Sequence, residues 1–240
     1  ASLMSHLLEL RSRLLKAVGA ILEVFLCLLP STQEVFEAVA RPLMSQLPKG
    51  STMIATQVAS PFLTPFKAAF YVAIMLAIPL VIYQIWAFVA PGLYRREKRF
   101  ARPLLGSSIF LFYCGVAFAY WVVFPVIFKF FISTAPRGVA VMTDITNYMD
   151  FILMMVLSFG VAFEVPIAVV LLVMTGLVSV DKLTNIRGYV LIAIFIIAAL
   201  LTPPDLISQS IMAVPMYLLY EGGIVFARLL SKKSAAEKAA

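Results

Sequence analysis

The sequence predicts an all-α integral membrane protein with six transmembrane helices in a single domain, residues 1–240. Of its 240 residues, 62% are hydrophobic and only 13% are charged, whereas a soluble domain is about half apolar and about a quarter charged. Long apolar stretches recur along the chain, and the segments between them are too short for a second, soluble domain. A helix needs about 20 mostly apolar residues to cross a bilayer.

Six apolar stretches meet or approach that requirement. In chain order they cover roughly residues 15–30, 66–90, 103–131, 149–177, 188–202 and 206–228. The fifth stretch, as a helix, reaches only about 22 Å at ~1.5 Å per residue. We therefore expect it to thin the membrane locally or to lie against protein.

Prolines interrupt four of the long stretches, and each should bend its helix by removing a hydrogen bond. They are Pro79, Pro125, Pro166 and Pro215. Bent helices can frame a concavity or can only fix the packing, and the sequence leaves both readings open.

The distribution of basic residues predicts the orientation. Fourteen of the 19 Lys and Arg residues fall on the side that carries both termini, and the positive-inside rule makes that side cytoplasmic. The net charge of +7 is accounted for by this bias and by anionic lipid, without nucleic acid as a partner. The external segments 31–65 and 132–148 hold many apolar residues, so we expect ordered caps.

The residues needed for catalysis are missing from the sequence. His6 is the only histidine, and there is no HExxH, GxSxG or glycine-rich phosphate loop. We therefore expect neither an enzyme, nor a metal, nor a cofactor. Cys27 and Cys114 lie in apolar stretches, where we expect two buried thiols that act as small hydrophobic groups.

Two acidic residues fall inside predicted spans. Glu164, in FGVAFEVPI, and Glu23, in GAILEVFLC, each lie near the middle of a span. Ionisable groups there usually face a bundle interior and mark function, although Glu164 can also be a hydrogen-bonded core residue. A proton-coupled secondary transporter using Glu164 is thus an alternative function, but we find no internal repeat of the kind such folds often show.

Two other acidic residues lie on the predicted cytoplasmic face. Glu9 has Arg13 at i+4 and should form a local ion pair with it. Glu97, in APGLYRREKRF, has no cation at helical spacing of three or four residues. The simplest interpretation of this segment is a run of charged residues that is exposed to solvent. Two carboxylates on a positive face also suit a guanidinium ligand, which forks onto a carboxylate as Lys cannot.

The sixth span opens with PPDLISQSIM, a polar start to an apolar helix. Asp205 can cap this helix, which is a purely structural role. Gln209 lies further in, where an amide side chain suits a helix–helix contact.

Five strings in order carry a family resemblance: HLLELRSRLLK, STMIAT…SPFLTPFK, PLVIYQIWAFVAPGLYRREKR, FGVAFEVPI and LLTPPDLISQ. Together they resemble the TatC family, the polytopic receptor of the twin-arginine protein translocase, over roughly residues 4–230. The resemblance implies a glove-like, concave bundle with short fifth and sixth helices in the bacterial cytoplasmic (inner) membrane. It also implies signal-peptide binding, assembly with TatB and TatA into a multimeric complex, and export of folded proteins driven by the proton-motive force.

The resemblance also assigns expected roles to individual residues. Glu97 and Glu9 match the acids that contact the twin arginines, and Phe88 matches an aromatic position of the same site. Glu164 matches an intramembrane glutamate, whose part in proton coupling or in guiding the signal peptide stays open. The remaining matches are a proline of the first external loop, Pro42, and three positions that meet the TatB or TatA helix, Thr202, Asp205 and Gln209. Glu23 departs from the family pattern, and the sequence names no partner for it.

Overall fold

The computed structural model describes residues 3–202 and 204–239, with the side chains of 90–98 and 238–239 left out of the description. All named elements of this part of the chain are helices, so the predicted all-α class is confirmed. Apart from two short turns, they are α1 (Leu3–Leu28), α2 (Thr32–Met44), α3 (Ser60–Phe118), α4 (Phe124–Ser133), α5 (Ile145–Ala162), α6 (Val165–Met174), α7 (Val180–Asn185), α8 (Arg187–Leu201) and α9 (Leu206–Ala239).

Among the described residues, five helical segments are long and apolar enough to cross a membrane, and α8 is a shorter apolar helix. Every predicted span overlaps one of these six segments, and α3 carries the second span and most of the third. The predicted fifth span agrees with the 15 residues of α8 to within one residue at each end. The count of six crossings and the cytoplasmic termini stay predictions.

The chain divides into two compact units, residues 1–85 with 116–157, and residues 86–115 with 158–240. Each unit is described by itself below, and the predicted single domain stays a prediction.

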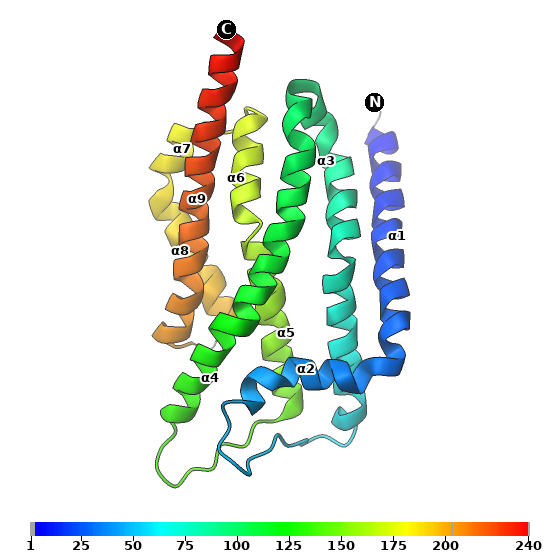
Figure 1. Ribbon diagram of the computed structural model, residues 1–240, viewed down its shortest axis with the longest axis vertical. Helices are drawn as coiled ribbons and strands as arrows, with labels where there is room; N and C mark the ends of the chain where they lie inside the picture. Colours follow the sequence, from blue (N-terminus) through cyan, green and yellow to red (C-terminus); the bar gives the residue numbers. More distant parts are fainter. Residues whose placement is uncertain (1–2, 203, 240) are drawn as a thin grey trace. The chain divides into compact units, whose positions relative to one another are not determined.

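In the first unit, α1 is followed by a short turn, Leu29–Ser31, and by the amphipathic helix α2. Pro30 sits at the start of that turn, where its missing N–H is tolerated. Figure 1 shows that α2 runs across the end of α1 instead of continuing it. The sequence indicated an ordered segment here, and the structure makes its first part a helix.

Pro42 lies within α2 and is buried, so it is part of a helix and not of an irregular loop. Proline has no N–H, so the carbonyl of Ala38, four residues earlier, loses its intrahelical donor. The Tyr120 hydroxyl donates to that carbonyl instead, and the Tyr148 hydroxyl donates to the Val39 carbonyl at 3.0 Å. The proline therefore frees an acceptor by which α2 is held.

The two segments predicted to be external meet in the first unit through backbone and side-chain bonds. The Ile54 amide donates to the Thr143 carbonyl at 3.0 Å, and the Ile145 amide donates to the Ile54 carbonyl at 2.8 Å. Asp144 accepts bonds from the hydroxyl and the amide of Thr56 at 2.9 and 3.1 Å. The two segments therefore hold each other in place.

In the second unit, α3 and α5 approach closely because two glycines face the contact. A Cβ on Gly115 would lie 2.4 Å from the Phe159 carbonyl oxygen, and one on Gly160 would lie 2.8 Å from the Phe112 ring. At Gly115 the obstacle is backbone, so a side chain there would force the helices apart, whereas at Gly160 the Phe112 ring would have to shift. This close crossing fixes the distance between α3 and α5 near Gly115 and Gly160.

The short helix α8 is fixed against α9 by polar contacts at its N-terminal end. Arg187 donates to Glu221 at 2.7 Å and lies within 2.6 Å of its second oxygen. The Tyr220 hydroxyl donates to the Leu183 carbonyl of α7 at 2.6 Å. These contacts support the expectation that a helix too short for a bilayer lies against protein.

Two of the prolines break their spans more sharply than a simple bend. The fourth predicted span is two helices, α5 and α6, separated at Phe163 and Glu164, just before Pro166. A turn of π-helix, Ala119–Val123, precedes Pro125. In both places the chain rearranges around a hydrogen bond that proline cannot make.

The expectation of two buried thiols is wrong for Cys27. Both cysteines are free, but Cys27 is exposed and Cys114 is partly exposed. Cys27 lies on α1, whose described residues include none that is buried in the chain.

Candidate functional site

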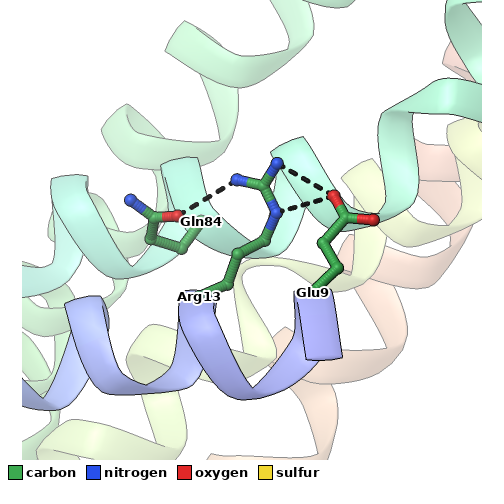
Figure 2. A network of polar contacts seen from close by, with 3 residues as sticks. All are labelled: Glu9, Arg13 and Gln84. Atoms are coloured by element: carbon green, nitrogen blue, oxygen red, sulfur yellow. Dashed lines mark hydrogen bonds and ion pairs between the residues drawn. The ribbon is translucent and has the colours of Figure 1, made fainter. Parts of the chain in front are cut away.

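Glu9 lies near the start of α1 in a network of three side chains (Figure 2). Arg13, one helical turn later, donates to Glu9 Oε1 through Nε at 3.1 Å and Nη2 at 3.0 Å. Its remaining nitrogen, Nη1, donates to Gln84 Oε1 on α3 at 3.2 Å. The predicted ion pair between Glu9 and Arg13 is confirmed, and Gln84 adds a contact between α1 and α3.

The Glu9 carboxylate is only half engaged. Both Arg13 bonds go to Oε1, and no described residue donates to Oε2. The Glu9 side chain is 39% exposed, so a ligand can reach the second oxygen. An anionic group that is exposed and half engaged is a ready acceptor for a cation.

Glu97 and Phe88 are the other two residues predicted for this site, and the structure describes the side chain of Phe88 alone. Glu97 lies outside the described side chains. Phe88 is on α3, half-buried, and already in contact within the chain. It belongs to the second unit, whereas Glu9, Arg13 and Gln84 belong to the first.

Glu164 occupies the break between α5 and α6, in the N-cap position of α6. The buried hydroxyl of Ser108, from α3, donates to Glu164 Oε2. Glu164 Oε1 is also buried and accepts no hydrogen bond from the described residues. The predicted intramembrane polar site is therefore a helix break with one carboxylate oxygen held and the other unsatisfied.

The segment between α8 and α9 uses two of its three predicted contact residues within the chain. The Thr202 hydroxyl donates to the Ala198 carbonyl at 2.7 Å, and Asp205 Oδ1 accepts the Ser208 amide at 2.7 Å. The predicted helix cap at Asp205 is thus confirmed. Gln209 is half-buried and its side chain bonds no described residue.

Two buried polar atoms at the start of α9 have no hydrogen-bond partner among the described residues, Asp205 Oδ2 and Ser208 Oγ. Orphaned groups of this kind are uncommon in folded proteins. They make the start of α9 a polar spot in an otherwise apolar helix.

The sequence predicted these residues but, apart from Arg13, not the side chains that form hydrogen bonds with them. Gln84 and Ser108 are polar positions in apolar stretches, YQIW and GSSIF, and that pattern could have marked them. Tyr120 and Tyr148 could not be paired with α2 from the sequence, because each contact joins residues more than 80 positions apart. Among the described residues, no group of three or more His, Cys, Asp or Glu side chains could hold a metal ion.

Comparison with known families decides the relationship. The model of the Sec-independent protein translocase protein (TatC) matches residues 5–215 of the chain. The chain belongs to the TatC family. The predicted resemblance is therefore confirmed, and the fold class and the function class that it implied follow the family.

TatC relatives cover nearly the whole chain. The TatC protein of Azotobacter chroococcum is 52% identical over 93% of this chain and 88% of its own length. That of Escherichia coli K12 is 51% identical over 94% of this chain and 88% of its own length. A crystal structure of the twin arginine translocase receptor TatC superposes with a TM-score of 0.84 at 34% identity, covering 94% of this chain and 99% of that one.

TatC membership fixes the class and location of the protein. It is a component of a protein translocase, and a multi-pass protein of the bacterial inner membrane. A translocase component is consistent with the expectation that the chain is not an enzyme. The alternative function, a proton-coupled secondary transporter, is set aside because the family and its relatives are translocase proteins.

Proposed function

We propose that this TatC protein binds twin-arginine signal peptides on its cytoplasmic face, through recognition and without catalysis. It thereby starts the export of folded proteins driven by the proton-motive force. The observation that carries the proposal is the half-engaged carboxylate of Glu9, whose Oε2 has no described donor. Glu97 is the second acidic contact of the proposed site, and Phe88 supplies an aromatic face.

The geometry around Glu9 supports an arginine ligand over a lysine ligand. Arg13 already forks onto Oε1 with two nitrogens at 3.0 and 3.1 Å, so a planar guanidinium fits on this carboxylate. An incoming arginine has the same planar donors for Oε2, whereas an ammonium lacks the fork. Aromatic faces also attract guanidinium groups, which is the role we give to Phe88.

The test is the affinity of the detergent-solubilised protein for a twin-arginine signal peptide and for its twin-lysine version. A hydrogen bond to a charged group contributes about 1.5–3 kcal/mol, which corresponds to roughly tenfold or more in affinity. We therefore expect the arginine peptide to bind about tenfold more tightly or better. Glu97→Gln should remove most of this difference, and Glu9→Gln a part of it.

Glu34→Gln is the matched control, because Glu34 is an exposed glutamate in the first turn of α2. It should leave both affinities unchanged. Equal binding of the two peptides, unaffected by Glu97→Gln, would contradict the proposal. Glu97 would then be only one member of a solvent-exposed run of charged residues.

For the complex, we propose TatB and TatA as single-span partners that contact the start of α9 through Gln209. Gln209 is the one residue of the predicted contact set whose side chain bonds no described residue. Thr202 and Asp205 contribute by shaping the turn before it. Glu164 is the intramembrane polar site of the same proposal.

The partner contact is tested by co-purification with each single-span protein. Gln209→Leu should reduce recovery of the partner, because the amide loses its hydrogen bond across the helices. Gln33→Leu, at an exposed position of α2, is the control and should leave recovery unchanged. Full recovery with Gln209→Leu would show that the partner contact does not depend on this residue.

A further inference from the structure

Two turns of the same type lie at the starts of two segments in the first unit. Residues 48–51 (PKGS) form one turn and residues 136–139 (PRGV) form the other. In each turn the amide of the fourth residue donates to the proline carbonyl, at 3.0 and 3.2 Å. Gly50 and Gly138, at the third position, have positive φ angles of 87° and 82°, which is the type II geometry that glycine favours. The two segments thus begin with matching turns.

Beyond these turns, residues 51–56 and 139–144 continue without a further turn or bend. They pair in parallel at Ile54 and Asp144. Five residues between the turns and this pair have backbone groups that bond no described residue: Thr52, Met53, Ala140, Val141 and Met142. A ladder between two parallel segments therefore begins at Ile54 and is missing on the side of the turns.

A cavity of about 440 Å³ lies where the ladder is missing. Both segments line it, with Ser51 and Thr52 from the first and Val141 and Met142 from the second. Its volume is in the range of about 300–1,000 Å³ that ligand pockets have. The cavity therefore separates two backbone edges that have the direction of a parallel pair but not its hydrogen bonds.

The backbone groups that face this gap follow from the pair that closes it. Ile54 bonds the Thr143 carbonyl and the Ile145 amide, and in a strand every second residue bonds to the same side. The next residues whose amide and carbonyl point across the gap are therefore Thr52 and Val141. Each wall thus offers a donor and an acceptor. An anion such as phosphate would use the donors alone, whereas an extended peptide uses both.

Two cations lie at one end of the gap. Lys49 and Arg137 occupy the second positions of the two turns, and both are exposed. Neither forms a hydrogen bond or an ion pair with a described residue. By contrast, Lys67 in the same unit is paired with Asp150. Because the two segments are parallel, both turns lie at the same end, so a ligand in the gap meets positive charge at that end.

We propose that this gap binds an extended peptide segment of another protein, which pairs its main chain with both walls and places acidic side chains beside Lys49 and Arg137. The bound segment completes the ladder that Ile54 and Asp144 begin. The partner is thus a protein that exposes an acidic, unpaired strand on the same side of the membrane as these turns. The proposal does not use Glu9, so it does not rest on twin-arginine recognition.

The probes are two fluorescein-labelled peptides of alternating valine and threonine, with two aspartates at the amino end of one and at the carboxyl end of the other. Their binding to the detergent-solubilised full chain is measured by fluorescence anisotropy. We expect one of the two to bind, namely the one whose strand direction suits the walls. It should bind about fivefold or more tightly than its version with lysines, since exposed ion pairs are modest. Methylation of alternate peptide nitrogens removes main-chain donors and should abolish binding.

Variants test the two parts of the site separately. Lys49→Gln combined with Arg137→Gln should weaken binding by about fivefold, whereas Lys129→Gln, at an exposed position of α4, should not change it. Val141→Pro removes an amide that points across the gap and should abolish binding. Ala140→Pro is its control, because that amide points to the other side. Thermal unfolding of each variant shows that it is folded.

Hydrogen exchange locates the bound peptide without any substitution. The Thr52 and Val141 amides should exchange about tenfold more slowly when the peptide is bound. The proposal is overturned if neither aspartate peptide binds, if the methylated peptide binds equally well, or if these two amides keep their exchange rates. Displacement of the peptide by millimolar inorganic phosphate, with both amides unprotected, would show an anion site only and would also overturn it. Affinity for the twin-arginine peptide should be unchanged in these variants, so this proposal and the proposed function can fail separately.

Discussion

Glu9 and Glu164 have the same hydrogen-bond pattern in two different surroundings. Each carboxylate has one oxygen bonded by a side chain of α1 or α3, and a second oxygen that no described residue bonds. Glu9 lies on α1, which has no buried residue, and its side chain is 39% exposed. Glu164 lies at a helix break in the second unit, where its free oxygen is buried.

The comparison shows that the surroundings decide what an unused oxygen can do. The Glu9 side chain is open to solvent, so a ligand that reaches its free oxygen displaces only solvent. Water has no access to the buried oxygen of Glu164, so the missing hydrogen bond there lowers the stability of the fold. The first arrangement suits reversible recognition, whereas the second makes the helix break around Glu164 sensitive to small changes in packing.

The largest expected effect comes from removing the close crossing that positions Ser108 and Glu164. In Gly115→Val the new side chain would meet the Phe159 carbonyl, a backbone atom that cannot move alone. We expect destabilisation by about 3 kcal/mol or more, at the upper end of overpacking effects, measured by unfolding in mixed detergent micelles.

Gly106→Ala is the control on the same helix, since a Cβ at Gly106 would meet nothing within 4 Å. It should be neutral or slightly stabilising because alanine favours helix over glycine. Equal stability of the Gly115→Val and Gly106→Ala proteins would show that α3 and α5 do not cross as closely as described.

The next effect tests the enclosed carboxylate directly. Ser108→Ala removes the only described donor to Glu164 and should destabilise the protein by about 1–3 kcal/mol, the cost of an unsatisfied buried group. Ser107→Ala should change stability little, since Ser107 is exposed and bonds only the Pro103 carbonyl of its own helix. If both variants lose the same stability, Glu164 does not depend on Ser108.

Asp144 sharpens the comparison, because it is outside the spans and yet bonded at both oxygens. Oδ1 accepts two bonds from Thr56, and Oδ2 accepts the Asn147 amide at 3.2 Å. Partial desolvation acts to raise the pKa of Asp144, but these hydrogen bonds together lower it below the usual value. A lowered pKa means that the bonds stabilise the fold above the unfolded-state pKa, and that this contribution is lost as the pH falls through the folded-state pKa.

We therefore expect the hydrogen-exchange protection of the Ile54 and Thr56 amides to be constant near neutral pH and to fall below about pH 4. Asp144→Asn should show weaker protection at neutral pH and no such fall. Asp181→Asn, at the first turn of α7, is the control and should keep the wild-type response. Protection that does not depend on pH in the unmodified protein would contradict the role given to Asp144.

The sequence predicted the membrane class, the apolar segments and the short fifth span, because hydropathy and length are local properties. It also predicted the Glu9–Arg13 pair and the Asp205 cap, which depend on spacings of four and three residues. It did not predict the break at Glu164 as two helices, or the exposure of Cys27. These depend on which helices pack together, and that is set by distant contacts such as Gly115 with Phe159.

The smallest expected effect on stability falls on the exposed member of the pair. Glu9→Gln removes one ion pair with Arg13 at a partly exposed site, and such pairs contribute no more than about 0.5 kcal/mol. Unfolding should therefore change little, while the affinity for the twin-arginine peptide falls, because an amide gives a guanidinium only a neutral acceptor. A loss of stability as large as that of Ser108→Ala would mean that Glu9 is a structural residue like Glu164. A lower affinity at unchanged stability would show that an oxygen left open to water is available for recognition.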